Sequence, residues 1–490
     1  MFGSIAARVP QDKDLPERAW RMEVLRRVLD GTLYDVLPHP FHDERKAGGE
    51  YVPLRDRRPC VRYALCRTVV EDSVSLLFGE GRFPAIDCAD EATRESLHDL
   101  LVEAGGNRVM IDAATRGSIG SVAILLRVLH GRIFLDVLDT QYLTPVWDPE
   151  APDRLVTVRE RYKVRGRALR EQGFDIREEE LEADHWFARE WTPDDETWFL
   201  PTRVASDGPR AALEIDADRS VRHALGFVPM VWIRNLPGGD APDGWCTFRS
   251  AIDAQIEIDY QMSQAGRGLK YSSDPTLLIK EPAAPDGEII KGAGNALVVS
   301  EKGDARLLEI GGTASAAVLD YVRTLRELAL ESVHGNRSNA DKVSAAQSGR
   351  AMEMLHQPLI WLADRLRISY GQEGLLRLAR MIVAAAQMYP IKVQGRLVRL
   401  SAEAPLSLRW PEWFPPTGED KQQAASTLAT LRNAGLISRE TAVKDRAPVY
   451  DVDHVAVELA RIAADETACR HPGRAGERNG DDAGMTGMAV

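Results

Sequence analysis

Apolar residues recur at helical spacing in two long stretches in the middle of the chain, 247–271 and 313–333. Apolar positions three or four residues apart form one face of a helix, so each stretch is predicted to be an amphipathic helix. Thr247 is expected to cap the start of the first helix. The recurring positions are Ile252, Ile256, Ile258, Met262 and Leu269 in the first stretch, and Val318, Leu319, Val322, Leu325, Leu328, Ala329 and Val333 in the second.

The segment between these two helices follows a different pattern. Prolines and glycines punctuate it, and the short apolar runs between them are typical of strands rather than helices. We therefore expect two neighbouring helices with a small β-module inserted between them, like a stalk with a foot. The strand-like runs are 276–279, 288–290, 296–300 and 306–310.

The chain after the second helix is polar over residues 336–346 and helical again over residues 347–388. Pro358 and Gly371 interrupt the later apolar periodicity. A proline inside a helix removes a backbone hydrogen bond and bends the helix. The pattern predicts a polar loop followed by one long, kinked helix.

The N-terminal half mixes helical and alternating patterns, and its proline- and glycine-rich loop 235–244 is the best internal boundary. Helices are expected at 18–29, 60–78, 91–104 and 108–117, and strands at 121–129, 132–138, 155–164, 185–190, 197–200 and 227–233. A turn at His130-Gly131 would join the first two strands as a hairpin.

Past the long helix, the strand-like runs 391–400 and 406–410 are expected to rejoin the sheet of the N-terminal half. Three further helices are predicted at 421–433, after a Ser438 cap, and at 453–465, and disorder is expected from about residue 466. The mixture of separate helices and antiparallel strands indicates an α+β fold.

Composition narrows the possible functions. The chain has 490 residues, enough for roughly three domain-sized units, and a net charge of −12. This acidity argues against a protein that grips nucleic acid with a basic surface, but an acidic channel wall would let DNA pass without sticking. Five scattered cysteines without a CxxC pair indicate reduced thiols. Neither a signal peptide nor an apolar run long enough for a membrane span is predicted, so no membrane partner is expected.

The sequence lacks the common catalytic motifs: no P-loop, HExxH, GxSxG or GxGxxG after a strand. Asp253 and Glu257 share one helix face and could bind a cation or act in acid–base catalysis. Without a further ligand type nearby, we interpret them as a solvated or channel-facing stripe. No cofactor or metal is predicted, and a structural or conduit protein is favoured over an enzyme.

Two other groups have a functional and a packing interpretation. His39 and His42 have metal-ligand spacing, but the neighbouring prolines exclude an ordinary helix, so a surface loop is expected. Trp186, Trp191 and Trp198 could form a base-stacking platform, but no basic residues are seen between them, and sheet packing is favoured.

The order of these elements resembles the portal proteins of tailed bacteriophages, of the SPP1-type family. Four segments carry the resemblance over about residues 50–465: the front helix Cys60–Gly81, the run Ala113–Asp148, the start of the long helix Ser344–Leu359, and the C-terminal Thr417–Val443 with its NAGLIS stretch. The specificity lies in the order of these motifs. The chain departs from the family in a short polar N-terminus and a modest C-terminal helical region.

The resemblance implies a division into named regions. It assigns residues 1–245 to the wing, 246–270 and 312–334 to the two stem helices, 271–311 to the clip, 335–346 to the tunnel loop, 347–389 to a long kinked wing helix, 390–416 to a β return to the wing, 417–465 to the crown and 466–490 to a disordered tail.

The resemblance also implies a function: a portal at one capsid vertex, built from about twelve identical subunits in a ring. Double-stranded DNA would pass non-specifically through the channel, and the ring would contact the large terminase subunit, the major capsid and scaffold proteins, and the head-completion or tail connector protein. The protein would reside in the host cytoplasm during assembly and then in the virion. The DNA-facing tunnel-loop residues would be Asn336, Arg337, Asn339, Lys342 and Gln347, with Asp253 and Glu257 facing the channel lower down.

An infectious phage, a prophage and a gene transfer particle all fit this resemblance. Two interpretations from other classes remain beside it. One is a non-viral helical adaptor or scaffold that oligomerises without DNA, and the other is a metal-dependent enzyme with its acidic site at Asp253 and Glu257.

Overall fold

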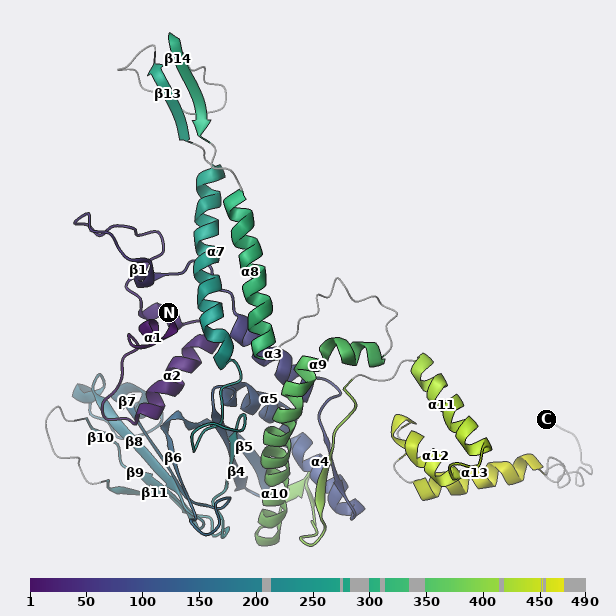
Figure 1. The fold of residues 1–490 in the computed structure, drawn as a ribbon. Helices are drawn as coiled ribbons and strands as arrows, with labels where there is room; N and C mark the ends of the chain where they lie inside the picture. The colour runs from purple at the N-terminus through teal and green to yellow at the C-terminus, as the bar shows by residue number, and fades with distance from the viewer. Residues whose placement is uncertain are drawn as a thin grey trace, which may run out of the picture. The chain divides into compact units, whose positions relative to one another are not determined.

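The computed structural model describes residues 1–204, 213–273, 276–282, 299–308, 313–334, 349–413, 418–450, 452 and 455–470 (Figure 1). These residues form two compact units. The first comprises residues 1–343 and 353–413, and the second comprises 344–352 and 414–490. Helices and antiparallel sheets occur together in the first unit, which confirms the predicted α+β class.

Two antiparallel sheets pack face to face in the first unit. The larger has the strand order β11-β9-β8-β7-β6, with β10 also paired to β8, and the smaller has the order β12-β4-β5. Their strands are β4 (Ser121–Leu129), β5 (Arg132–Asp139), β6 (Leu143–Trp147), β7 (Leu155–Arg165), β8 (Asp184–Trp191), β9 (Asp195–Phe199), β10 (Thr202–Arg203), β11 (Ile215–Arg222) and β12 (Met230–Arg234).

The central strand β4 is apolar on both faces, as expected for a strand buried between two layers. Ala123 and Leu125 point to the larger sheet, where they join a buried cluster with Trp191 and Trp232. The alternate residues of β4 face helices α5 and α10. The predicted β4–β5 hairpin is confirmed, and both residues of its turn, His130 and Gly131, have positive φ, as a two-residue hairpin turn requires.

Six α-helices precede α7 in the described chain, and the last of them, α6, lies between β7 and β8 in sequence. They are α1 (Phe2–Ala6), α2 (Glu17–Leu29), α3 (Leu65–Phe78), α4 (Glu91–Glu103), α5 (Gly106–Gly117) and α6 (Gly166–Glu171). Arg18 of α2 pairs with both carboxylate oxygens of Asp243 at 2.7 Å and donates to Thr140 O at 2.5 Å. This bidentate pair ties α2 to the loop that leads out of the sheets.

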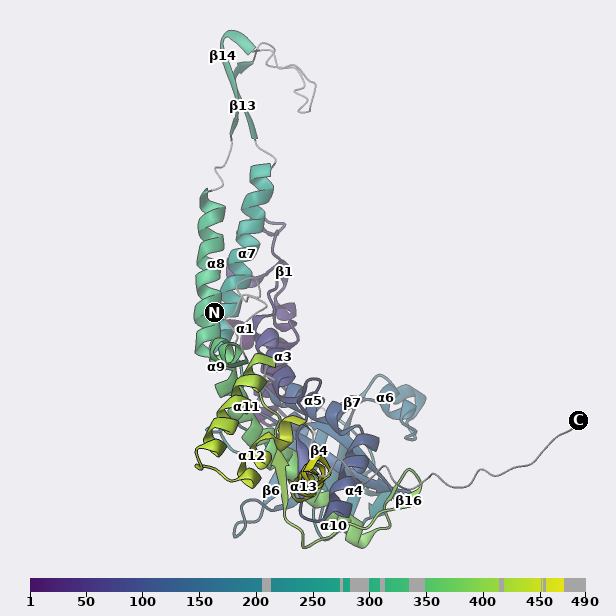
Figure 2. The same ribbon diagram turned by 90° about the vertical axis from the view of Figure 1, so that its right-hand side faces the viewer.

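The two predicted central helices are confirmed as α7 (Ile252–Ser273) and α8 (Thr313–Ser332), which pack side by side (Figures 1 and 2). Between them in sequence lies an antiparallel hairpin, β13 (Thr276–Pro282) with β14 (Val299–Leu308). The described parts of the predicted runs 296–300 and 306–310 therefore belong to one strand, while the run 288–290 lies outside the described residues.

The long helix after residue 348 is confirmed, and it is interrupted near Gly371 as predicted. It consists of α9 (Gly349–Leu366), a π-helical segment η7 (Arg367–Leu376) and α10 (Arg377–Met388). A side chain at Gly371 would collide with Trp410 at 2.6 Å, and one at Gly374 with Ile233 at 2.8 Å. The two glycines thus let the π-helical segment lie directly on its neighbours, whereas α9 continues through Pro358.

The remaining strands of the first unit correct one expectation. Residues 391–400 do not join either large sheet: β15 (Lys392–Val393) and β16 (Arg396–Leu397) pair only with each other, and β17 (Leu406–Arg409) pairs with β3 (Ala85–Cys88). Apolar alternation alone does not identify the partner of a strand. Here β17 pairs with β3, which has no other strand partner among the described residues. The strands β1 (His39–Pro40) and β2 (Arg57–Arg58) form a short parallel pair.

The expected cap at Thr247 is also wrong. A short 3-10 turn, Arg249–Ala251, precedes α7 and begins after Phe248 without a side-chain cap. The Thr247 hydroxyl instead accepts a hydrogen bond of 2.8 Å from Asn235 Nδ2. Asn235 is fully buried, also donates to the Trp245 carbonyl at 2.7 Å, and accepts from the Tyr370 hydroxyl at 2.9 Å. One amide thereby joins the end of β12, the approach to α7 and the π-helical segment.

The second unit contains α11 (Gly418–Asn433), α12 (Arg439–Arg446) and α13 (Val455–Arg470). The predicted cap is confirmed, because the Ser438 hydroxyl accepts from the Thr441 N–H at 3.1 Å. An ion pair of 2.9 Å between Arg439 and Glu466 links α12 to α13. Helix α13 continues to residue 470, a few residues past the predicted end of the last helix. The predicted disorder of the tail stays a prediction, because residues 471–490 lie outside the described chain.

The Asn235 junction yields a stability prediction. Changing Tyr370→Phe leaves Asn235 Oδ1 without a donor in a fully buried site, which should destabilise the protein by about 1–3 kcal/mol. Urea denaturation followed by tryptophan fluorescence measures this. Tyr51→Phe, which removes an exposed hydroxyl outside the junction, is the matched control and should leave the midpoint unchanged. An equal, small effect of both changes would contradict the role assigned to the junction.

Candidate functional site

The five predicted tunnel-loop residues, Asn336, Arg337, Asn339, Lys342 and Gln347, all lie outside the described residues. Their assignment as DNA-facing residues therefore stays a prediction. The described chain reaches this segment from α8 through His334, whose ring makes an edge contact with Trp361 of α9 at 6.2 Å.

The two predicted channel-facing acids lie in the first turns of α7. The Asp253 side chain is 74% exposed, and its carboxylate accepts a hydrogen bond of 3.1 Å from the backbone N–H of Phe2. Glu257 accepts one of 2.8 Å from Gln261 on the next turn. The described residues contain no cluster of three potential metal ligands at this or any other place.

A third acid of α7, Asp259, is fully buried and performs a different task. It belongs to a row of polar side chains at four-residue spacing, Gln255, Asp259 and Ser263, which faces the chain leading into α3. These side chains accept the backbone N–H groups of Cys66 at 2.8 Å, Tyr63 at 2.6 Å and Val61 at 3.0 Å, respectively. We call this row the α7 polar row.

The α7 polar row replaces a helix cap. Helix α3 begins after Ala64 without a side-chain cap, so the N–H groups of its first turn need outside partners. Gln255 is the hydrogen-bond acceptor for one of these groups, the N–H of Cys66. The Tyr34 hydroxyl, on the other side, donates to the second oxygen of Asp259 at 2.7 Å. The base of α7 is thus fixed to two N-terminal segments by buried hydrogen bonds.

Burial raises the pKa of Asp259 to about 6, although the hydrogen bonds from Tyr34 and Tyr63 and the charge of Arg62 act in the opposite direction. Burial, together with the neighbouring Asp259 carboxylate, also raises the pKa of Tyr34 well above its ordinary value, so this hydroxyl remains a donor. Cys60, Cys66, Cys88 and Cys246 are free thiols, and burial raises the pKa of Cys246 to about 12.

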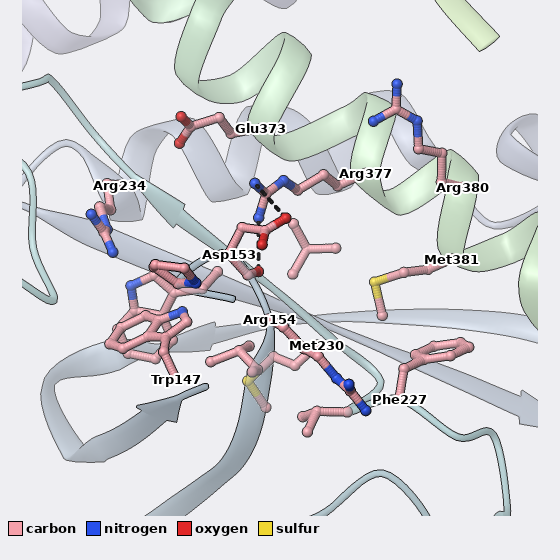
Figure 3. A pocket seen from close by; sticks show the side chains of 15 residues that line it. Trp147, Asp153, Arg154, Phe227, Met230, Arg234, Glu373, Arg377, Arg380 and Met381 are labelled. Atoms are coloured by element: carbon pink, nitrogen blue, oxygen red, sulfur yellow. Dashed lines mark hydrogen bonds and ion pairs between the residues drawn. The ribbon is translucent and has the colours of Figure 1, made fainter. Parts of the chain in front are cut away.

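A pocket with a cavity volume of about 570 Å³ opens between the sheets and the long helix (Figure 3). Trp147, Met230 and Phe227 contribute to its apolar side, and the helix side carries Arg377 and Arg380 from α10. Trp147 and Trp232 meet edge to face with centroids 5.9 Å apart, and the guanidinium of Arg234 lies 5.3 Å from the Trp147 ring.

The predicted tryptophan cluster is mainly a packing feature, as expected. Trp191 is fully buried in the core between the sheets, and Trp198 packs edge to face on Phe187. The expectation of no interleaved basic residue is wrong, because the guanidinium of Arg189 lies 4.6 Å from the Trp191 ring and 5.0 Å from the Trp198 ring. Its ion pair with Glu160 neutralises it, so Arg189 is not a free cation for phosphate. Arg161 lies 4.1 Å from the Trp186 ring in the same way.

The family model described as "Phage portal protein, SPP1 Gp6-like" matches residues 65–468. The chain therefore belongs to this family of phage portal proteins. It is a structural protein of the portal vertex of a capsid. No helix in the described part of the chain is long and apolar enough to span a membrane.

Two solved structures are similar to the chain at low identity. One is titled "Virion of native gene transfer agent (GTA) particle" and the other "Neck of empty GTA particle computed with C6 symmetry". Each is 12% identical and aligns over 79% of this chain and 88% of its own, with TM-scores of 0.36 and 0.38 respectively. Superpositions this loose carry no functional argument. Among curated proteins, none matches the chain significantly.

Sequence reasoning missed two features of the site. The α7 polar row could have been found from the spacing of Gln255, Asp259 and Ser263, because polar residues at every fourth position amid an apolar face signal buried hydrogen bonding. The arginines of the pocket come from positions far apart in the chain, such as 154, 234 and 377, and no local pattern brings them together.

The raised pKa of Asp259 predicts a pH dependence of stability. The ordinary pKa of an aspartate is 3.8, so the folded protein binds this proton more tightly than the unfolded chain does. The stabilisation that follows from this is lost as the pH rises through about 6. The stability of the native protein relative to Asp259→Asn should therefore be greatest at low pH and fall by about 2 kcal/mol between roughly pH 4.5 and 7.5. Urea denaturation of both proteins across this range measures the difference.

Asp253→Asn is the control for this experiment, because it removes an exposed carboxylate from the same helix. Asn at position 259 also alters the hydrogen bonds to Tyr34 and Tyr63, which shifts the free energy of unfolding by a constant amount. The informative quantity is therefore the change of the free-energy difference with pH. A difference between native protein and Asp259→Asn that stays constant with pH would show that Asp259 does not titrate in this window.

Proposed function

We propose that about twelve copies of this chain form a closed ring and that double-stranded DNA passes through its channel without sequence-specific contacts. The match of residues 65–468 to the portal family carries this proposal. The large terminase subunit, the major capsid and scaffold proteins, and the tail connector are the partners of such a ring. The chain itself has no catalytic role in this proposal.

Exposed apolar side chains on α8 support assembly through this helix. Leu319, Tyr321 and Leu328 are 41%, 47% and 56% exposed, which is unusual for large side chains in an isolated helix pair. On a helix that turns about 100° per residue, Tyr321 and Leu328 lie on one flank of the surface that packs against α7. Leu319 lies on the opposite flank.

The two flanks also differ in charge. At the same turn per residue, Arg323 and Arg326 fall on the side of Leu319, and both are exposed. A closed ring joined by one repeated contact needs two different surfaces on each subunit, one for each neighbour. The dissimilar flanks of α8 meet this requirement, whereas a two-fold dimer would use one surface twice.

The polar segment after α8 is the proposed site of DNA contact. Its cations, Arg337 and Lys342, would supply one weak phosphate contact per subunit, which suits a sliding polymer better than a tight grip. Asp253 and Glu257 are proposed to face the channel, and the exposure of Asp253 supports this. The net charge of −12 fits a wall that repels phosphate.

Two alternatives make different predictions for the purified protein. A non-viral adaptor would be a compact dimer or small oligomer without a central hole. A metal-dependent enzyme would lose nuclease activity on Asp253→Ala. Asp253 faces the N-terminal ammonium group of Met1 at 3.5 Å and the backbone N–H of Phe2, and Glu257 faces the amide of Gln261, and these donors do not favour a bound cation.

The flank assignment gives an assembly prediction. The native protein should form rings in negative-stain electron microscopy, with a mass of about twelve subunits by light scattering. Leu328→Asp should reduce rings to single subunits or short arcs, because it buries a charge in the subunit contact. The thermal midpoint of the single subunit should hardly change, since Leu328 is largely exposed.

Val102→Asp makes the same kind of change at an exposed position of α4 and is the matched control. It should leave the rings intact. Rings of Leu328→Asp that are as abundant as those of the native protein would remove this flank of α8 from the contact. A compact native dimer would count against the ring itself.

The loop assignment gives a packaging prediction. Arg337→Ala combined with Lys342→Ala should leave the rings intact and reduce the amount of nuclease-protected DNA several-fold, because every subunit loses its phosphate contacts. Arg55→Ala combined with Arg396→Ala removes the same charge from exposed positions elsewhere and should package normally. Unchanged packaging by the loop variant would assign DNA contact to another segment.

A further inference from the structure

The pocket of Figure 3 combines an apolar interior with a basic rim. Its interior is formed by aromatic and methionine side chains on strands β6 and β12 and the segment before β12. Arginines approach it from three separate parts of the chain: Arg154 from the β6–β7 turn, Arg234 from the end of β12, and Arg377 and Arg380 from α10.

Most of this positive charge is uncompensated. Arg377 pairs with Asp153 at 4.0 Å and also donates to the Asp153 carbonyl at 3.4 Å. Arg154, Arg234 and Arg380 are exposed and form no ion pair with any described residue. Asp153 and Glu373 are the acids of the pocket, so four arginines face two carboxylates in a chain whose net charge is −12. The local excess of arginine favours an anionic ligand.

The apolar interior restricts the kind of anion. A cavity of about 570 Å³ has the size that suits a small ligand or a few side chains. It is too small to admit a nucleic-acid duplex, and its apolar interior offers nothing to a phosphate backbone. A linear peptide meets both conditions, because an aromatic or aliphatic side chain can enter the interior while carboxylates on either side reach the arginines.

We propose that this pocket docks an acidic linear segment of a partner protein, with a large apolar residue as its anchor. Arg377, already oriented by Asp153, and Arg380 lie three residues apart on one face of α10 and would receive carboxylates on the helix side. Arg234, stacked on Trp147, would receive one on the sheet side. This binding is independent of the ring and of its contacts with DNA.

The test uses the full-length protein and a fluorescein-labelled peptide with a central Leu-Trp pair between glutamates, followed by fluorescence polarisation. The peptide should bind saturably. Arg234→Ala combined with Arg380→Ala should weaken it roughly tenfold, the effect of losing two exposed charge contacts. Arg55→Ala combined with Arg396→Ala, the same change of charge outside the pocket, should leave the affinity unchanged.

Exchanging the charges makes the test specific. Arg380→Glu should reject the glutamate peptide and improve binding of a matched peptide with lysines in place of the glutamates. Replacing the Leu-Trp pair by alanines should also abolish binding, because the interior is then left empty. Thermal unfolding of each variant shows that it remains folded, and Arg380 is exposed, so its change should not affect folding.

Three results would overturn the proposal. One is a peptide that fails to bind the native protein, and the second is binding that the paired Arg234 and Arg380 change does not affect. The third is a labelled DNA duplex that binds more tightly than the peptide and loses affinity in the same variant, which would assign the arginines to nucleic acid. Failure of ring assembly would not bear on this measurement, because all pocket residues belong to one subunit.

Discussion

Helix α3 starts without a cap of its own, and the way this deficit is met determines how the first unit is built. Unpaired N–H groups at a helix start cannot remain buried without partners, and Gln255 of α7 accepts the N–H of Cys66 in the first turn. Asp259 and Ser263 of α7 accept the N–H groups of Tyr63 and Val61 in the chain that leads into α3. Because these residues lie on the helix that continues toward the β13–β14 hairpin, the same contact fixes the origin of the α7–α8 pair. The buried Asn235 amide fixes the adjoining approach to α7 and the π-helical segment.

Local pattern determined what could be predicted from the sequence. The α7–α8 pair, the β4–β5 hairpin and the Ser438 cap follow from spacing within a few residues, and each was predicted at the observed place. The partner of β17 and the role of Thr247 depend on segments more than a hundred residues away or on a buried amide, and these predictions were wrong. Asp259 lies within the predicted helix 247–271, but whether a carboxylate in a helix is buried depends on what packs against it.

The net charge of the whole chain does not describe the charge of its individual surfaces. The chain is acidic as a whole, yet Arg323 and Arg326 lie on one flank of α8, and the pocket carries three arginines that form no ion pair with any described residue. Arginine retains its charge at any physiological pH, so these basic surfaces are constant features. Asp259, with a pKa raised to about 6, is by contrast a group whose charge changes near neutrality.

The unlike flanks of α8 have a consequence for direction. Subunits that meet through two different surfaces must all point the same way around the axis, so the assembly has no two-fold axis across its plane. Its two mouths are then built from different parts of the chain and present different chemistry. In the proposed ring the two ends of the channel therefore differ, and a protein that binds one end would not recognise the other.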